Sequence, residues 1–119
     1  MIYQTELVDQ VLVVRLEGNL IGGLSAQALL KEANERIGTG TRLCAVDISE
    51  VHYLNSAGID VLITLLTRFR NKGGELLVVN PTGQVRKRQA IAKLNAIFQP
   101  TESRENAIEK LKSSVTNDQ

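Results

Sequence analysis

The chain has 119 residues and a mass of 13.1 kDa, with 43% hydrophobic and 23% charged residues. This length suits one compact domain with a single core, and it is too short for two. The 14 basic and 13 acidic residues leave a net charge of +1, which creates no overall field to attract nucleic acid or anionic lipid. Composition therefore argues against a disordered chain, a membrane-spanning protein and a general nucleic-acid binder.

Cysteine usage and the N-terminus indicate the compartment. Cys44 lies in the apolar run 43–46, and no second cysteine is present to form a disulfide or a thiolate metal site. We interpret it as a small buried apolar residue. Residues 1–6 lack the basic and apolar regions of a signal peptide. We therefore expect a cytoplasmic protein with no membrane insertion, no metal and no cofactor.

The N-terminal third predicts a hairpin followed by a helix. Residues 3–8 and 11–17 are strand-like runs around a turn at residues 9–10, and Gly18 is placed to end the second run. From residue 24 or 25 to about 37, apolar side chains recur at helical spacing, with Gly38 as the stop. These apolar positions are Ala28, Leu29, Ala33 and Ile37.

Two continuous apolar runs, 43–48 and 76–79, fit interior parallel strands covered on both faces. Between them a helix is expected to begin near Ser56 or Ala57 and to end before the glycines 73–74. One stripe of this helix is predicted to face the sheet, namely Ile59, Leu62, Ile63, Leu66 and Phe69. Val61 and Leu65 fall off that stripe, so Val61 is expected to meet water, either as a scattered surface residue or as part of a partner contact.

The C-terminal part predicts a third helix from residues 81–82 to about 94, a short strand at 97–98 and a final helix from Thr101 or Ser103. Ala107, Ile108 and Leu111 form the apolar face of that last helix, before a polar tail at 113–119. The order ββαβαβαβα predicts a single α/β domain over residues 1–119, with its core at about 3–112. We expect about five strands in a mostly parallel sheet, an antiparallel N-terminal strand at or near an edge, and four helices.

The segment 47–58 places one hydroxyl, that of Ser56, at the start of the second helix. The first turn of a helix has unpaired N–H donors and a partial positive charge, so it favours a phosphate or a carboxylate. Serine is also among the preferred N-cap residues. Local chemistry therefore leaves two interpretations of Ser56, a helix cap and a site that accepts a phosphate.

Other chemistries find less support. Asp47 lies near a strand end like the phosphoacceptor of a response-regulator receiver, but no neighbouring acidic cluster is available to hold Mg²⁺. His52, the only histidine, precedes Ser56 by four residues without the acid or oxyanion arrangement of a hydrolase. The basic cluster 86–88 fits a solvated helix face better than a nucleic-acid contact. The glycine pairs lack the spacing of a nucleotide-binding loop, so we assign no catalytic residue and expect no enzyme.

Three motifs follow one another along nearly the whole chain. They are Leu16-Glu17-Gly18-Asn19-Leu20, then Val46-Asp47-Ile48-Ser49 leading to Asn55-Ser56-Ala57-Gly58-Ile59, then Gly73-Gly74-Glu75-Leu76-Leu77-Val78-Val79. In this order they resemble the STAS domain, and among its members the bacterial anti-sigma factor antagonists. The ordered combination is specific, whereas each motif alone is weak.

The resemblance implies a regulatory switch. In that family the loop before the second helix usually reads Asp-Ser-Ser/Thr-Gly, and its first serine, here Ser56, is phosphorylated by an anti-sigma factor that is also a serine protein kinase. The unphosphorylated domain would bind the anti-sigma factor and free its sigma factor, until phosphorylation blocks the contact and a serine phosphatase restores it. We expect a monomer or weak dimer, with partner contacts at Asn19, Leu20, Ile21, Asn55, Ser56, Ala57, Gly58, Asp60, Val61 and Thr64.

This sequence departs from the family's pattern at the loop and at the second strand. The Asp before the serine is Asn55, and the Glu and Asp of a Gly-Glu-Leu-Asp pattern are Asn19 and Ile21. Asn55 keeps the size and hydrogen bonding of Asp but lacks the charge that a kinase can use in recognition or metal organisation. An alternative therefore keeps the fold without the switch, as a non-phosphorylated STAS interaction subunit, for example of an ABC lipid transporter.

Overall fold

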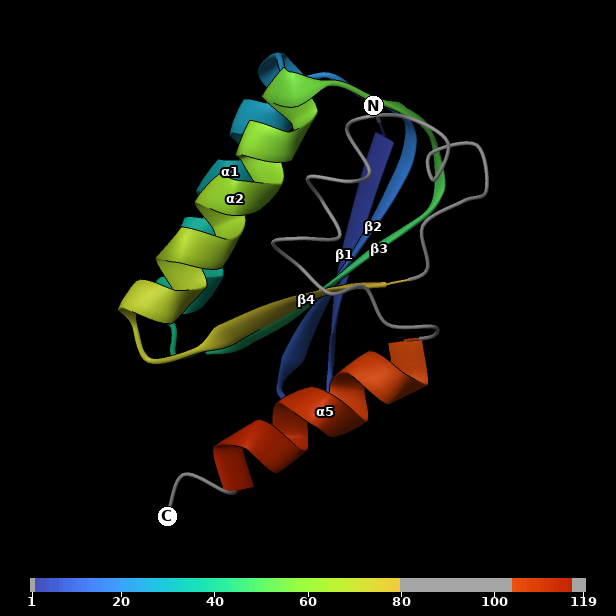
Figure 1. Cartoon of the computed structure of the whole chain (residues 1–119). Coiled ribbons are helices and arrows are strands. Elements are labelled where there is room, and N and C mark those ends of the chain that lie inside the picture. The colour runs from blue at the N-terminus through green and yellow to red at the C-terminus, as the bar shows by residue number, and fades with distance from the viewer. Residues whose placement is uncertain (1, 80–103, 117–119) are drawn as a thin grey trace.

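The structure is a computed structural model that describes residues 2–79 and 104–116. In this part of the chain, four strands form one mixed sheet, with helices on both of its faces (Figure 1). The elements are β1 (Ile2–Val8), β2 (Val11–Leu20), α1 (Leu24–Gly38), β3 (Leu43–Leu54), α2 (Ser56–Asn71), β4 (Glu75–Val79) and α5 (Arg104–Thr116). The predicted third helix, the strand at 97–98 and the basic cluster 86–88 lie outside the described residues.

The strands follow their sequence order across the sheet, β1-β2-β3-β4. β1 pairs with β2 in antiparallel fashion, whereas β2 with β3 and β3 with β4 are parallel pairs. Asp9 and Gln10 join β1 to β2 with positive φ angles of 52° and 70°, as a two-residue hairpin turn of type I′ requires. The predicted antiparallel N-terminal strand at the edge is therefore confirmed.

The interior strands place apolar side chains on both faces of the sheet, and these side chains are buried in two separate cores. Leu12, Val14 and Leu16 of β2 belong to the larger core, which α1 and α2 cover. Val11 and Val13 point the other way, into a second core beneath α5. This alternation follows from the period of two along a strand. Figure 1 shows α1 and α2 side by side on one face and α5 below the other.

Two strands run further than the sequence predicted. β2 continues through Gly18, where φ is +88°, to Leu20, and β3 continues beyond Ile48 to Leu54. Register shifts between Arg15 and Glu17 and after Gly18 add residues to β3, so the regular apolar alternation breaks while the pairing persists. The last helix also runs to residue 116, so the start of the predicted polar tail is helical.

The burial of α2 corrects the predicted exposure of Val61. Val61 is only 8% exposed and Leu65 is 0% exposed, and both belong to the larger core. The reason is that α2 packs against α1 as well as against the sheet, which widens its buried face (Figure 1). In α1, Ala26 is buried where the predicted Ala28 is exposed.

Candidate functional site

The N-terminal end of α2 is built around Asn55. This residue is the N-cap in extended conformation, and its side-chain Oδ1 accepts a hydrogen bond from the Gly58 N–H at 2.9 Å. Its backbone carbonyl accepts the first helical bond, from the Ile59 N–H at 3.0 Å. The interpretation of Ser56 as the cap is therefore wrong, because Ser56 is the first residue inside the helix. Its hydroxyl is not engaged in starting the helix.

The end of β2 contacts the first turn of α2. The Asn55 N–H donates to the carbonyl oxygen of Leu20 at 3.4 Å. Gly58 packs so closely on the same carbonyl that a Cβ there would lie 2.0 Å from the oxygen. A Cβ on Gly22, in the turn from β2 to α1, would lie 3.4 Å from the Cβ of Ala57. Two segments that are distant in sequence, residues 19–22 and 55–58, therefore form one surface.

This surface offers a hydroxyl beside unpaired helix donors. Ser56 and Ala57 are exposed, and the geometry of a helix gives their N–H groups no intrahelical acceptor. The first turn of α2 contains no acidic residue, so nothing in it opposes a negative group. The partial positive charge of the helix end adds to this preference. By this chemistry, the start of α2 favours a negative group over a positive one.

The predicted partner-binding residues divide by exposure. Exposed members are Asn19, Ile21, Ser56, Ala57 and Asp60, and half-buried ones are Asn55 and Thr64, whose hydroxyl donates to the Asp60 carbonyl at 2.8 Å. Buried members are Leu20, Gly58 and Val61. A buried side chain offers no surface to a partner in this conformation. Leu20 and Gly58 instead position the exposed residues around Ser56.

Two exposed apolar residues near this surface were absent from the predicted set. Leu24, the first residue of α1, is 83% exposed, and Tyr53, which pairs with Asn19 across β3 and β2, is 39% exposed. Ile21, three residues before Leu24, is 47% exposed. Leu24 lies outside the buried stripe of its helix, and that signal is readable from sequence. Exposed large apolar side chains are typical of protein-binding surfaces when they gather in one patch.

The residues considered for other chemistries lie elsewhere in the fold. Asp47 is 5% exposed, and its Oδ1 accepts a hydrogen bond from the Ser49 N–H at 2.9 Å, so it is inaccessible as a receiver phosphoacceptor. His52 is exposed on β3 and lines an open hollow with Ile2, Glu17, Gly18 and Glu50. Cys44 is buried, as predicted, and this burial raises the pKa of its thiol. Among the helices described, none has the length and apolarity to cross a bilayer.

Comparison with known proteins identifies the family. The sequence model of the STAS domain matches residues 3–108, so the chain belongs to the STAS domain family. A Bordetella bronchiseptica protein named as the anti-sigma factor antagonist BtrV is 27% identical over 108 residues, which cover 91% of this chain and 92% of that protein. This relative in sequence is thus one that is named as an anti-sigma factor antagonist.

Solved structures show the same fold. The Bacillus anti-sigma factor antagonist SpoIIAA in its unphosphorylated form superposes with a TM-score of 0.78 at 19% identity, covering 94% of this chain and 97% of the other. Its phosphorylated form gives a TM-score of 0.71 at 19% identity, covering 92% and 98%. Both likenesses concern the fold of nearly the entire chain.

Proposed function

We propose that this protein is an anti-sigma factor antagonist whose binding to a serine-kinase anti-sigma factor is switched off by phosphorylation of Ser56. The observation that carries the proposal is the exposed Ser56 hydroxyl, one residue inside α2 and unused by the helix cap. Binding would release a sigma factor in the cytoplasm, and a serine phosphatase would reset the switch. Support comes from BtrV, which is named as such an antagonist, and from SpoIIAA, whose solved forms include a phosphorylated one.

The fold would tolerate the phosphate. A phosphoserine adds about −1.5 to −2 charge at neutral pH. At residue 56 that charge would face the N–H groups of the first helical turn and the positive end of the helix dipole. Asn55 caps the helix through a neutral amide, so no carboxylate adjacent in sequence repels the new charge. We therefore expect the phosphorylated protein to stay folded.

A phosphate on Ser56 would disrupt the contact with the partner. Ile21 and Leu24 expose apolar side chains near the β2–α1 turn, and this turn packs beside Ala57. A partner surface that matches these groups and a neutral hydroxyl would have to desolvate a dianion after phosphorylation. Desolvating an unpaired charge costs several kcal/mol, which is enough to abolish micromolar binding. The protein would act in this scheme as a substrate and a binding partner, with no catalysis of its own.

Binding measurements on charge variants test the proposal. Ser56→Asp should weaken affinity for the cognate anti-sigma factor at least about tenfold, while Ser56→Ala should leave it nearly unchanged. Thr67→Asp is the matched control, because Thr67 is exposed on the same helix about 16 Å further along its axis. Incubation with the kinase and ATP should add one phosphate, which mass spectrometry places on Ser56. Unchanged affinity of Ser56→Asp, or no phosphate on Ser56 with every cognate kinase, contradicts the switch.

One observation favours a second candidate function. Asn55 supplies the cap without the negative charge that a kinase can read, so the fold needs no phosphorylation to explain this residue. The same surface would then serve as a constitutive interaction site, for example toward an ABC lipid transporter. Co-purification from cells separates the two candidates. Recovery of an anti-sigma factor supports the first, and recovery of transporter subunits with unmodified Ser56 supports the second.

A further inference from the structure

β1 is an edge strand of the sheet that the described residues form. It lies at the end of the sheet order, and no described strand pairs with it on the side away from β2. Its 7 residues pair with β2 in unbroken register from Ile2 to Val8, so no bulge interrupts the strand. It also contains no proline and no lysine. Soluble proteins commonly blunt an exposed edge with such features, because an open edge is a template for a further strand.

The hairpin turn determines which backbone groups of β1 face outward. In a two-residue turn the Val8 carbonyl accepts from the Val11 N–H, which makes these two residues a hydrogen-bonded pair. Hydrogen-bonded and non-hydrogen-bonded pairs alternate along an antiparallel ladder. Even-numbered residues of β1 therefore bond to β2. Tyr3, Thr5 and Leu7 direct their N–H and C=O groups away from the sheet.

These outward groups are self-complementary about a two-fold axis at Thr5. In an antiparallel pairing of β1 with the β1 of a second copy, Thr5 meets Thr5 and Tyr3 meets Leu7, so all three outward-facing residues exchange hydrogen bonds. On the opposite face Ile2 meets Val8 and Gln4 meets Glu6. No like charges face each other directly, and apolar residues face apolar ones.

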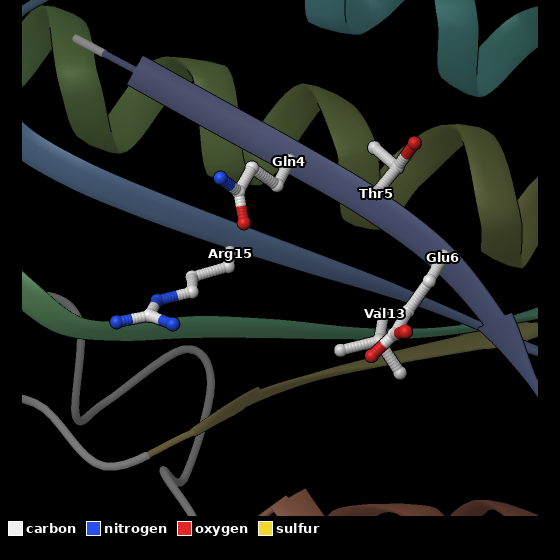
Figure 2. Close-up of a pocket in the computed structure, with 5 residues that line it drawn as sticks. All are labelled: Gln4, Thr5, Glu6, Val13 and Arg15. Carbon is white, nitrogen blue, oxygen red and sulfur yellow. The ribbon is translucent and has the colours of Figure 1, made fainter.

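The side chains fit this register. Ile2 is 63% exposed and Leu7 is 49% exposed, so each leaves apolar surface that the second copy would cover. Figure 2 shows Gln4 and Glu6 on one side of β1, facing the hollow that Val13 and Arg15 also line, and Thr5 on the other. The Thr5 hydroxyl donates to Glu32 of α1, which holds this side chain toward the helix and away from the edge.

We propose that two copies of this chain pair through β1 into a dimer whose sheet is continuous across the two-fold axis at Thr5. The interface is separate from the N-terminal end of α2 and does not depend on the function proposed for Ser56. The dimer is weak, because one strand pair buries little surface and the two Glu6 residues are diagonal neighbours, about 7–8 Å apart at the backbone.

A proline substitution tests the edge directly. Sedimentation velocity of the full chain over a concentration series up to about 1 mM should show a shift from the 13.1 kDa monomer toward twice that mass. Thr5→Pro removes an outward N–H without touching the ladder to β2, and should raise the dissociation constant at least about tenfold. Thr5→Val is the matched control, because it loses the hydroxyl bond to Glu32 but keeps the N–H, and it should dimerise like the parent. The proposal is wrong if the parent stays monomeric over this concentration range. It is also wrong if Thr5→Pro leaves the dimer intact, or if Thr5→Val abolishes it.

A second pair of variants keeps the test decisive if Thr5→Pro fails to fold. Leu7→Lys places a charge at the edge opposite Tyr3 of the second copy and should abolish dimerisation. Leu24→Lys makes the same change at the most exposed large apolar residue of the described chain, far from the β1 edge in sequence, and should leave the dimer unchanged. The reverse outcome for either variant contradicts pairing through β1. Leu24→Lys should weaken binding to the anti-sigma factor, whereas Leu7→Lys should leave that binding unchanged. A failure of the proposed function can therefore be told apart from a failure of the proposed dimer.

Discussion

The side-chain oxygen of Asn55 accepts a hydrogen bond from the backbone N–H of Gly58 at 2.9 Å, and this contact begins the helix that carries Ser56. Gly58 in turn rests against the carbonyl of Leu20. The two residues therefore join the start of α2 to the end of β2. Loss of either contact would remove support from the surface around Ser56.

Removing the cap should destabilise the protein. We expect Asn55→Ala to lower the free energy of unfolding by about 1 kcal/mol, because the Gly58 N–H loses its acceptor. Asn55→Asp retains the acceptor and should match the parent or exceed it by about 0.3–1 kcal/mol at low salt, through its charge near the helix N-terminus. Urea denaturation measures both. Asn34→Ala, at an exposed position within α1, is the control and should not destabilise. Equal losses at residues 55 and 34 would count against the cap.

The charge at residue 55 should matter to a kinase if Ser56 is its substrate. We expect Asn55→Asp to raise the initial rate of phosphate incorporation at Ser56 by severalfold, because it restores the carboxylate of the family's pattern. Mass spectrometry over a time course measures the rate. Asn34→Asp adds the same charge on α1 and should leave the rate unchanged. Equal rates for the parent and Asn55→Asp would show that the kinase does not read this charge.

Gly58 should tolerate no side chain. A Cβ would lie 2.0 Å from the Leu20 carbonyl oxygen and 2.9 Å from Leu54 Cδ1, so α2 would have to move away from β2. We expect Gly58→Ala to lower the free energy of unfolding by about 2–3 kcal/mol and to weaken partner binding as well. Gly38→Ala is the control, because a Cβ there meets nothing within 4 Å. Denaturant titration measures the stability of both variants. Equal stability of Gly58→Ala and Gly38→Ala would contradict the close packing at Gly58.

Cys44 should make stability fall at alkaline pH. Burial raises the pKa of this thiol in the folded protein above its ordinary value of 9.0, so the folded state keeps a proton that the unfolded state releases. The effect of the thiol on the free energy of unfolding is constant below about pH 9. Above that pH the free energy of unfolding falls with a slope that approaches about 1.4 kcal/mol per pH unit. Denaturation from about pH 8 to about pH 10 should therefore show the parent losing stability relative to Cys44→Ala. Parallel pH profiles would contradict burial of the thiol.

Local patterns were sufficient for the order of the elements within the described residues. The apolar runs at 43–48 and 76–79 predicted buried strands, and both lie in the sheet whose two faces are covered. The glycines 73–74 follow the end of α2, as predicted. The segment 55–58 pointed to a helix start with an exposed serine. Residues 80–103 carry the predicted third helix and last strand, so these two elements stay predictions.

The errors arose where a neighbour in space decides the outcome. Asn55 and Ser56 are both good N-cap residues by type. Asn55 is the cap because its backbone is extended and its N–H donates to the Leu20 carbonyl. Val61 was predicted to be exposed from a single apolar stripe, but α1 provides a second surface against which α2 packs. Helical periodicity describes one buried face and carries no information about a second one.

The ordered motifs of the sequence indicated the STAS family by resemblance. Apolar periodicity and turn residues determined the order of the described strands and helices and the serine at the start of α2, because these signals act over a few neighbouring positions. Only the tertiary structure decided that Asn55 caps the helix, that Val61 and Gly58 are buried, and how β1 is registered against β2. These properties depend on contacts between residues distant along the chain, such as Leu20 with Gly58 and α1 with α2. Local sequence signals do not encode the positions of such contacts.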